Sequence, residues 1–386
     1  MQPVSEPEEA RRRNPQDPRS SPKFLLHPRD RKSVASRILS TYGNLPDGRE
    51  ARLFILQNAH GFRATVTDWG ATLVAMETPD RQGNLADITL GSDTLEGWLA
   101  NPFYLGATIG RFGNRLRDGK FTLDGKEHTL ATNNTPGGIP CHLHGGVKGF
   151  DKVLWHGEQN GNSVTFTYLS PDGEEGYPGT LSVRVTYTLT EENELLWQAE
   201  ASTDAPTIVN LVHHTYWNLS GDPTRTILDH LMELQSDAFL PTDAGMIPTG
   251  EIAPVAGTPM DFRSPTVIGE RIDADYEPIQ FAAGYDHCWI VRGEPGTLRP
   301  AARVTCPDSG RVLNVLSDQP GIHFYAGNFI DGSFTGKGGV PYARRSGLCL
   351  ETEGYPDAPN HPHFPSCILR PGETYRHTMV HRFSLE

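Results

Sequence analysis

From about residue 38 to the C-terminus, the chain consists of short segments in which apolar and polar residues alternate. A strand sends successive side chains to opposite faces, so this spacing predicts strands with one buried face. The clearest case covers residues 180–190, whose apolar members include Val183, Val185, Tyr187 and Leu189. Clusters of Gly, Pro, Asn and Asp separate the segments and favour turns. A helical period is nearly absent, and only residues 95–100 are expected to form a short helix.

This pattern predicts an all-β fold, a large antiparallel sandwich that forms a single domain over residues 38–386. Neither a change of composition nor a repeat of fixed period divides this region. Other segments that we expect to be strands are residues 62–67, 163–170, 194–203, 287–292, 301–306, 311–317, 321–329, 347–353 and 375–384. Residues 1–37 combine a basic run with several prolines and no apolar period, and they are predicted to be a disordered tail.

The composition limits which classes of partner and which cellular compartment we expect for the protein. A formal net charge of -13 disfavours nucleic acid or an anionic membrane surface as partner, because both need a basic patch. No run of about 18 apolar residues is available to span a membrane, and the N-terminal segment lacks the apolar centre of a secretory signal. The 5 cysteines are scattered and include no Cys-x-x-Cys pair, which is typical of unpaired thiols in a reducing compartment. We therefore expect a cytoplasmic protein.

Residues 207–219 are expected to form one strand that carries a candidate functional histidine. One face of this strand is mostly apolar and contains Leu211 and His213. The other face is a row of hydrogen-bonding side chains that includes His214 and Tyr216. Two adjacent histidines on a strand cannot enter the same cleft, and the polar face favours His214.

Two polar stretches precede this strand. Residues 110–117 hold Asn114 and Arg115, whose amide and guanidinium groups suit sugar hydroxyls or anions, although a plain surface loop explains them as well. His142 and His144 alternate as a metal-binding pair would, but no carboxylate stands at ligand spacing beside them. We therefore expect no metal.

Three candidates follow the strand. Asp286 and Gln319 each stand in a segment that is typical of a turn. Glu351 lies within the apolar segment 347–353, where an unpaired carboxylate is costly to bury. A His and a Glu on the polar faces of two strands can form a proton-transfer pair, so Glu351 is a candidate acid–base residue.

Together these stretches resemble one family, the aldose 1-epimerases or galactose mutarotases. The matching segments occur in the family's order over about residues 40–386, and the ordered set is far more specific than any one motif. They are Gly-Arg-x-x-Asn-Arg-Leu at 110–116, Leu-His-Gly-Gly at 143–146, Ser-Pro-Asp-Gly at 170–173, the stretch 209–219, Tyr-Asp-His at 285–287, Gln-Pro-Gly at 319–321 and Leu-Glu-Thr at 350–352. One departure is His213, which stands where members of the family often carry Asn.

The resemblance implies a β-supersandwich of the galactose mutarotase type, whose cleft interconverts the α and β anomers of free aldohexoses such as glucose and galactose. It implies that His214 is the general acid and Glu351 the general base. The residues that it implies hold the sugar are Asn114, Arg115, His144, Tyr216, Asp286 and Gln319. Such a reaction needs no cofactor and no metal, and we expect a monomer or a weak homodimer.

Three other functions fit parts of the pattern. A hexose-phosphate 1-epimerase on the same fold would need additional basic residues in the cleft, for which the candidates are Arg111, Arg117 and Lys148. A non-catalytic carbohydrate-binding protein would be marked by loss of the His or the Glu, and both are present. A glycoside hydrolase would need two close carboxylates, such as Glu351 and Glu353, and would leave the histidine without a role.

Overall fold

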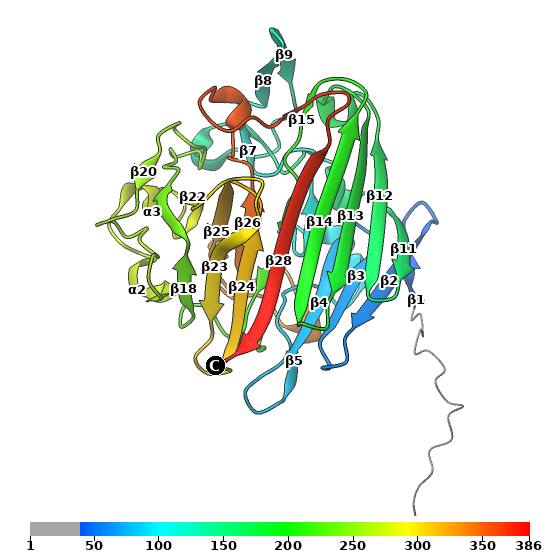
Figure 1. Ribbon diagram of the computed structural model, residues 1–386, viewed down its shortest axis with the longest axis vertical. Coiled ribbons are helices and arrows are strands. Elements are labelled where there is room, and N and C mark those ends of the chain that lie inside the picture. The colour runs from blue at the N-terminus through cyan, green and yellow to red at the C-terminus, as the bar shows by residue number, and fades with distance from the viewer. Residues whose placement is uncertain (1–38) are drawn as a thin grey trace, which may run out of the picture. The chain divides into compact units, whose positions relative to one another are not determined.

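The structure is a computed structural model that describes residues 39–386, and these residues form a sandwich of antiparallel sheets (Figure 1). Strands separated by turns dominate the described chain, and its helices are short. The predicted all-β class is therefore confirmed. The tail predicted over residues 1–37 lies outside the described residues.

The largest sheet has nine strands, several of which run side by side across the view in Figure 1. In spatial order they are β11 (His156–Asn160), β12 (Ser163–Ser170), β13 (Leu181–Leu189), β14 (Glu194–Thr203), β28 (Tyr375–Leu385), β24 (Arg311–Ser317), β23 (Arg299–Thr305), β18 (Leu231–Leu234) and β21 (Thr266–Val267). The alternation predicted over residues 180–190 is present in β13. Val183 and Val185 are buried there, whereas Ser182 and Arg184 are exposed.

Two further sheets complete the layers. A five-stranded sheet consists, in spatial order, of β1 (Leu39–Asn44), β2 (Glu50–Gln57), β3 (Arg63–Thr67), β4 (Thr72–Pro79) and β5 (Leu85–Asp87). A six-stranded sheet consists of β17 (Tyr216–Trp217), β26 (Leu348–Glu353), β25 (Gly321–Tyr325), β22 (Asp286–Val291), β19 (Ser236–Phe239) and β20 (Ala253–Pro254). The strand pairs of all three sheets are antiparallel.

Short elements connect the sheets. Four two-stranded pairs join β6 (Ala107–Ile109) to β16 (Val212–His214), β7 (Arg115–Arg117) to β10 (Cys141–Leu143), β8 (Lys120–Leu123) to β9 (Lys126–Thr129) and β15 (Thr207–Ile208) to β27 (Ile368–Leu369). The α-helices are α1 (Leu95–Ala100), which has the predicted bounds, α2 (Ile268–Arg271) and α3 (Glu277–Phe281). Single 3₁₀ turns are η1 (Pro136–Gly138), η2 (Phe150–Lys152), η3 (Glu174–Gly176), η4 (Lys337–Gly339) and η5 (Ala358–Asn360). Over residues 39–386, no helix has both the length and the apolar character needed to cross a membrane.

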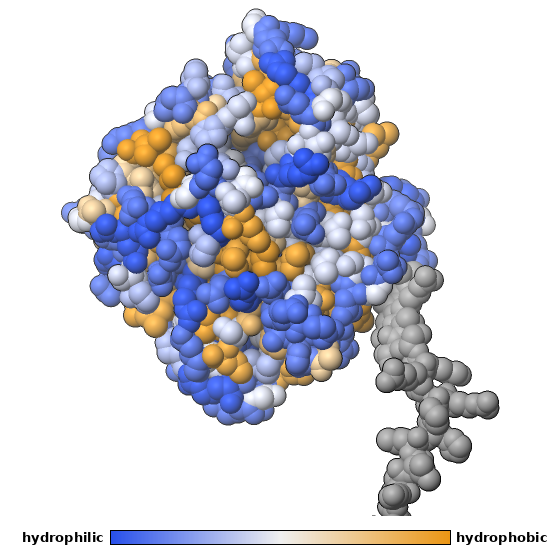
Figure 2. All heavy atoms as spheres, viewed as in Figure 1, coloured by the Kyte–Doolittle hydropathy of each residue, from blue (hydrophilic) through white to orange (hydrophobic). Residues whose placement is uncertain are grey.

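One hydrophobic core joins the three large sheets. Phe54 of β2, Trp197 of β14 and Leu350 of β26 are buried members of the same cluster. The face of the molecule shown in Figure 2 is largely hydrophilic, and its apolar side chains gather in separate patches. The alternation in the sequence thus turns the apolar side of each sheet towards a shared interior and leaves polar side chains outside.

The stretch over residues 207–219 is not one strand, which corrects the prediction. It is divided into β15, β16 and β17, which pair with β27, β6 and β26 respectively. The chain therefore passes between different strand partners within thirteen residues, which local alternation does not reveal. The two histidines nevertheless lie on opposite sides: His214 reaches a cavity, and His213 packs against Trp197 of the core.

His213 belongs to a group of fully buried histidines. Its Nε2 lies 2.9 Å from the Thr215 hydroxyl, and its ring centroid lies 5.3 Å from that of His381. Neither ring nitrogen of His381 has a hydrogen-bond partner. Burial lowers the pKa of His377 to about 4 and that of His381 to about 3, and it lowers the pKa of His213 well below its usual value. All three rings are therefore neutral in the folded protein near neutral pH.

We expect the folded protein to lose stability as the pH falls from about 8 to about 5, because the unfolded chain then binds protons that these rings cannot. Each such histidine removes about 2 kcal/mol at pH 5, since its unfolded pKa is about 6.5. Replacing His381 with Leu should therefore reduce the fall in the midpoint of thermal unfolding between these two pH values. An undiminished fall in His381→Leu would contradict this account.

Candidate active site

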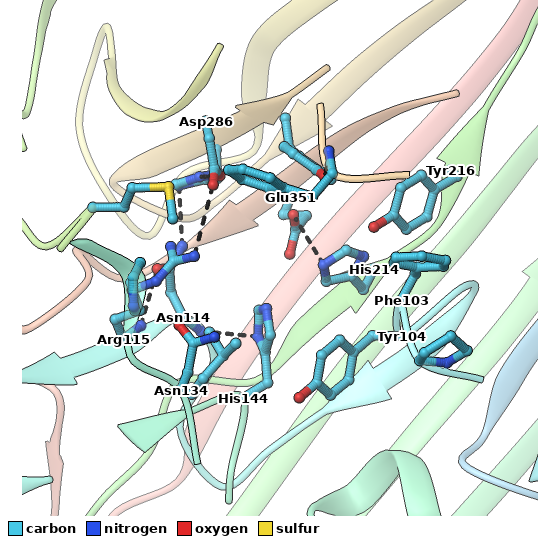
Figure 3. A pocket seen from close by; sticks show the side chains of 17 residues that line it. Phe103, Tyr104, Asn114, Arg115, Asn134, His144, His214, Tyr216, Asp286 and Glu351 are labelled. Carbon is cyan, nitrogen blue, oxygen red and sulfur yellow. Dashed lines mark hydrogen bonds and ion pairs between the residues drawn. The ribbon is translucent and has the colours of Figure 1, made fainter. Parts of the chain in front are cut away.

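The described residues enclose a cavity of about 360 Å³ (Figure 3). Its size lies in the range of about 300–1,000 Å³ that is usual for small-molecule pockets. The predicted site residues that line it are His214, Glu351, Asn114, Arg115, His144, Tyr216 and Asp286. Residues that are far apart in the sequence are thus brought together as the resemblance predicted, with Gln319 as the exception.

One side of the cavity is formed by three neighbouring strands of the six-stranded sheet. Asp286 begins β22, His323 is the central residue of β25, and Glu351 lies in β26. His323 and Glu351 are direct cross-strand partners, and Asp286 is paired with Tyr325. Directly opposed residues of an antiparallel pair point to the same face, so the register of these strands gathers the four side chains at the cavity.

His214 and Glu351 point towards each other across the cavity (Figure 3). Nε2 of His214 lies 3.6 Å from Oε1 of Glu351, and the two residues are only 4% and 2% exposed. Oε2 of Glu351 is buried without a hydrogen-bond partner. Because buried polar atoms are almost always hydrogen-bonded, a carboxylate oxygen left in this way indicates a group that serves a ligand.

Burial decides where the proton of this pair lies. It lowers the pKa of His214 to about 4 and raises the pKa of Glu351 well above its usual value, because the charged form of each group loses its hydration. After burial, the charge of His323 lowers the pKa of Glu351, and that of Glu353 raises it. In these surroundings the shared proton lies on Glu351, whereas the sequence suggested a protonated His214.

Asn114 and His144 adjoin the paired strands β7 and β10. Both have a left-handed backbone, with φ of 63° and 50°, a conformation that is strained for residues with a side chain and is concentrated at functional sites. The backbone N–H of Asn114 donates to Nδ1 of His144 at 3.1 Å, so Nε2 of this ring carries the hydrogen. Burial lowers the pKa of His144 well below its usual value. The neutral ring therefore offers an N–H donor to the cavity.

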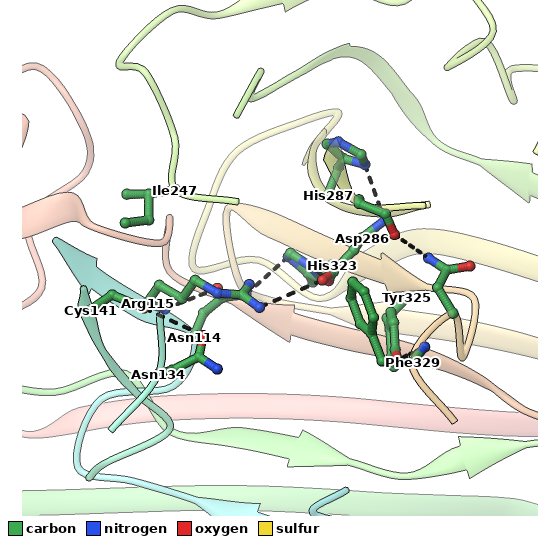
Figure 4. Close-up of polar contacts among 12 residues, drawn as sticks. Asn114, Arg115, Asn134, Cys141, Ile247, Asp286, His287, His323, Tyr325 and Phe329 are labelled. Atoms are coloured by element: carbon green, nitrogen blue, oxygen red, sulfur yellow. Dashed lines mark hydrogen bonds and ion pairs between the residues drawn. The ribbon is translucent and has the colours of Figure 1, made fainter. Parts of the chain in front are cut away.

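Each carboxylate oxygen of Asp286 faces a side chain that carries N–H groups (Figure 4). Nε2 of His323 donates to Oδ1 at 2.7 Å, and Nη2 of Arg115 lies 3.8 Å from Oδ2. Burial raises the pKa of Asp286, but the hydrogen bond from His323 and the charges of His323 and Arg115 outweigh it and hold this pKa at about 2. Asp286 therefore stays ionised and provides a strong acceptor for hydroxyl groups.

Part of the wall is formed by aromatic side chains that the sequence did not single out: Phe103, Tyr104, Tyr325 and Phe329. The ring of Tyr104 lies 4.7 Å from that of His144. Such faces are suited to the C–H groups of a sugar ring and keep water away from them. His323 and Tyr325 have a signal in the sequence, because they alternate within the predicted strand 321–329 beside the Glu351 segment. The loop that carries Phe103 and Tyr104 has none.

Gln319 is not among the residues that line the cavity, and its contact with a sugar stays a prediction. It stands in the turn between β24 and β25, and its amide donates to Oδ1 of Asp318 and to the carbonyl of Arg376. Because β25 begins only at Gly321, the side chains of this segment that reach the cavity are His323 and Tyr325.

The two alternating histidines, His142 and His144, face different surroundings. Nδ1 of His142 bonds to the carbonyl of Ala131, and its Nε2 bonds to the hydroxyl of Tyr177, so only His144 faces the cavity. Within residues 39–386, three potential metal-ligating atoms lie within 4.8 Å of one another only at His214, Cys349 and Glu351. There, Nδ1 of the ring faces the thiol at 3.6 Å and Nε2 faces the carboxylate at 3.6 Å. These are two separate contacts at different ring nitrogens rather than one coordination point.

Comparison with known proteins identifies the family. The family model described as Aldose 1-epimerase matches residues 52–382. The galactose mutarotase of Bos taurus is 47% identical over 347 residues, which cover 90% of this chain and 98% of that protein. The aldose 1-epimerase of Escherichia coli (strain K12) is 38% identical over 344 residues, which cover 88% of this chain and 97% of that protein. The chain belongs to the aldose 1-epimerase family.

Solved structures of aldose 1-epimerase relatives have the same fold. The GalM/aldose epimerase homologue from C. elegans has a TM-score of 0.79 at 31% identity, covering 87% of this chain and 99% of that chain. The galactose 1-epimerase from Lactobacillus acidophilus NCFM has a TM-score of 0.77 at 29% identity, covering 90% of this chain and 98% of that chain. The predicted family, the sandwich of galactose mutarotase type and the prediction of an isomerase of the aldose 1-epimerase class are all confirmed.

Proposed function

We propose that the protein interconverts the α and β anomers of a free aldohexose, such as glucose or galactose, and that His214 and Glu351 transfer the protons. The observation that carries this assignment is the buried pair itself. An imidazole and a carboxylate lie 3.6 Å apart in the cavity, and Oε2 of the carboxylate has no partner. Two groups that share a proton in this way can give one proton and take another at nearby atoms of a bound sugar.

The reaction needs both transfers. His214 gives a proton to the ring oxygen, and Glu351 removes one from the hydroxyl group at C1, so that the bond between C1 and the ring oxygen breaks and an open-chain aldehyde forms. Rotation about the C1–C2 bond then presents the other face of the aldehyde. When the ring closes, Glu351 returns its proton to the C1 oxygen and His214 recovers its own. Nothing is oxidised, and the catalyst ends in its starting state.

The position of the proton favours the opened sugar. Ring opening converts an imidazolium and a carboxylate into a neutral imidazole and a carboxylic acid, and burial favours this second arrangement because neither group is then charged. The cavity therefore stabilises the arrangement that accompanies the open-chain aldehyde. Burial favours the same neutral arrangement in the empty cavity, so the proton of the pair passes from Glu351 to His214 before the ring opens, and burial then favours the opening step itself.

The other groups are proposed to hold the hydroxyls. Asp286 accepts hydrogen bonds, whereas Nε2 of His144, the guanidinium of Arg115 and the amide of Asn114 donate them. Tyr216 stacks on the His214 ring, with ring centroids 5.2 Å apart, and helps to fix its orientation. Anchoring the rest of the sugar leaves C1 free to turn.

The cavity favours a free sugar over a sugar phosphate. Among the lining residues, all within the described chain, Arg115 is the only Lys or Arg, and it lies beside Asp286. Arg111 donates to backbone carbonyls that include those of Pro171 and Gly179, and Arg117 pairs with Asp243. Arg111 and Arg117 are therefore engaged elsewhere, and Lys148 does not line the cavity.

A glycoside hydrolase is supported less well. Glu353, the second carboxylate that such a reaction would use beside Glu351, does not line the cavity. Its Oε1 faces His323 at 3.2 Å and the Asn114 amide at 3.4 Å. His214 would again have no role in that chemistry.

The proposal includes the cellular compartment, the class of substrate and the oligomeric state of the enzyme. All five cysteines are unpaired in the described chain, and four of them are buried, which favours a reducing compartment such as the cytoplasm. The substrate is a small aldose. A monomer or a weak homodimer suffices, because one chain supplies every group named above.

We expect Glu351→Gln and His214→Asn each to lower kcat for mutarotation of α-D-glucose or α-D-galactose by about 10²- to 10⁴-fold, the usual contribution of a positioned proton transfer. Polarimetry, corrected for the buffer reaction, measures the rate. Gln319→Ala is the matched control outside the cavity, and it should change the rate by less than about twofold because substitutions away from a site are usually nearly neutral. Wild-type activity in Glu351→Gln would overturn the assignment of the base.

We also expect a bell-shaped dependence of kcat/KM on pH, because the pair must hold one proton. Below about pH 4, His214 takes up a second proton and no base remains. On the alkaline side, the limb lies above the ordinary pKa of a glutamate, since burial raises the pKa of Glu351, and activity falls there as the last proton is lost. Activity that keeps rising with pH, as in simple base catalysis, would contradict a shared proton.

A further inference from the structure

His323 is held between two buried carboxylates, and Figure 4 shows it beside one of them, Asp286. Its Nε2 lies 2.7 Å from Oδ1 of Asp286, and its Nδ1 lies 3.2 Å from Oε1 of Glu353. The three residues are 4%, 7% and 0% exposed. The Asn114 amide lies 3.1 Å from the same Nδ1 and 3.4 Å from Oε1 of Glu353, so both N–H groups converge on this oxygen.

This contact geometry favours a charged ring. An ionised carboxylate only accepts hydrogen bonds, so a ring nitrogen that bonds to one must carry a hydrogen. Burial raises the pKa of Glu353, and the hydrogen bond and charge of His323 oppose this rise. With an ionised carboxylate at each nitrogen, both nitrogens are protonated and His323 is an imidazolium. Although burial alone would lower it, the hydrogen bonds to Asp286 and Glu353 raise the pKa of His323 to about 10.

The charge lies next to the proposed catalytic base. His323 and Glu351 are direct cross-strand partners in β25 and β26, and such partners have Cβ atoms about 4.5–5.5 Å apart on the same face. Glu353 is two residues further along β26, so it shares this face. The imidazolium is therefore within a few ångströms of both carboxyl groups of β26.

The balance of charge depends on this residue. Arg115 and His323 offset two carboxylates, Asp286 and Glu353, and this leaves only Glu351, whose proton is shared with His214. Without the imidazolium, an ionised Glu351 would add a second uncompensated negative charge to a buried region, which is costly. Its proton would then be lost only at a higher pH.

The remaining ionisable groups around His323 do not supply the same charge. On β22, burial lowers the pKa of His287 to about 4, and burial raises the pKa of the Cys288 thiol well above its usual value, so both are neutral. Burial also raises the pKa of the Tyr325 phenol on β25 and that of the Cys349 thiol on β26. His144, on the loop after β10, is a neutral ring.

We propose that His323 is a positioning residue for this reaction, whose imidazolium, clamped between Asp286 and Glu353, sets the proton balance of the His214–Glu351 pair and orients Asp286. The proposal rests on the proposed function, because it concerns the pH range in which that pair holds one proton. It assigns no contact with the reacting atoms to His323. It also explains why two glutamates stand two residues apart on one buried strand: Glu351 exchanges protons, and Glu353 holds the cation.

The test is the pH profile of kcat/KM for His323→Gln and Glu353→Gln. Gln keeps a hydrogen-bonding amide in place of the ring but removes its positive charge, so both limbs of the bell should move to higher pH, by about one to two units for a charge at this distance. Glu353→Gln removes a negative charge, so both limbs should move to lower pH. The double variant removes one charge of each sign, and its limbs should return towards those of the wild type.

These shifts separate a charge effect from a structural one. If His323 were neutral, with Nδ1 accepting from the Asn114 amide, His323→Gln would lower activity without moving either limb, and the proposal would be overturned. The ¹⁵N shifts of the His323 ring in the wild type give a second measure that does not depend on the variants folding. We expect two protonated nitrogens up to about pH 9, because the pKa of His323 is raised to about 10, and one unprotonated nitrogen at pH 7 would refute the imidazolium.

Failure of this inference differs from failure of the proposed function. If the pH profile of kcat/KM is unchanged in His323→Gln and Glu351→Gln is inactive, only the role of His323 is overturned. Wild-type activity in Glu351→Gln would overturn the catalytic assignment, whatever the pH profile of His323→Gln.

Discussion

Three carboxyl groups lie at the cavity, on the two strands of one sheet that flank β25, and their burial is the constraint on which the site depends. Asp286, Glu351 and Glu353 are 7%, 2% and 0% exposed. Carboxylates removed from water in this way either find positive partners or take up protons. Arg115 and His323 provide the partners for two of them. The third carboxyl group, that of Glu351, has no cation of its own and shares a proton with His214. The proposed reaction uses this shared proton.

The sandwich makes this arrangement stable because its strands hold the charged groups at fixed spacings. Cross-strand register places His323 against Glu351, and β16 brings His214 over them from a different pair of strands. Groups on strands of a packed sheet are positioned more firmly than groups on loops, and proton transfer depends on distances of a few ångströms. Segments outside the strands contribute most of the aromatic wall and the hydrogen-bond donors at Asn114 and His144. Selectivity among aldoses is therefore expected to depend on these segments.

Much of the fold and part of the site could be predicted from the sequence. The alternation in β13 and the bounds of α1 were predictable because each depends on neighbouring residues alone. Strand parity also separated His214 from His213, since it holds even where a strand is short. The division of residues 207–219 among three partners was not predictable, because pairing is decided by segments far away in the chain.

The position of Gln319 outside the lining of the cavity was unpredictable for a similar reason. Gln319 belongs to a motif that matches the family, but β25 begins two residues later, and a shift of position along a strand decides which side chains face the cavity. His323 is visible in the sequence only as one histidine in an apolar strand. Its importance comes from Asp286 and Glu353, which lie on the strands either side of it. The shifted pKa values of His214 and Glu351 are also products of burial, which no local pattern reports.

The central claim is that the ring opens through proton transfer while the bond between C1 and its own oxygen stays intact. It is tested most directly with an aldose that carries ¹⁸O in the C1 hydroxyl, followed by NMR as the enzyme interconverts the anomers. Ring opening and closing at the ring oxygen should leave the label in place over many turnovers, apart from the slow exchange that occurs without enzyme. Loss of the label at the rate of anomer interconversion would mean that the C1–oxygen bond itself breaks, and it would contradict the account.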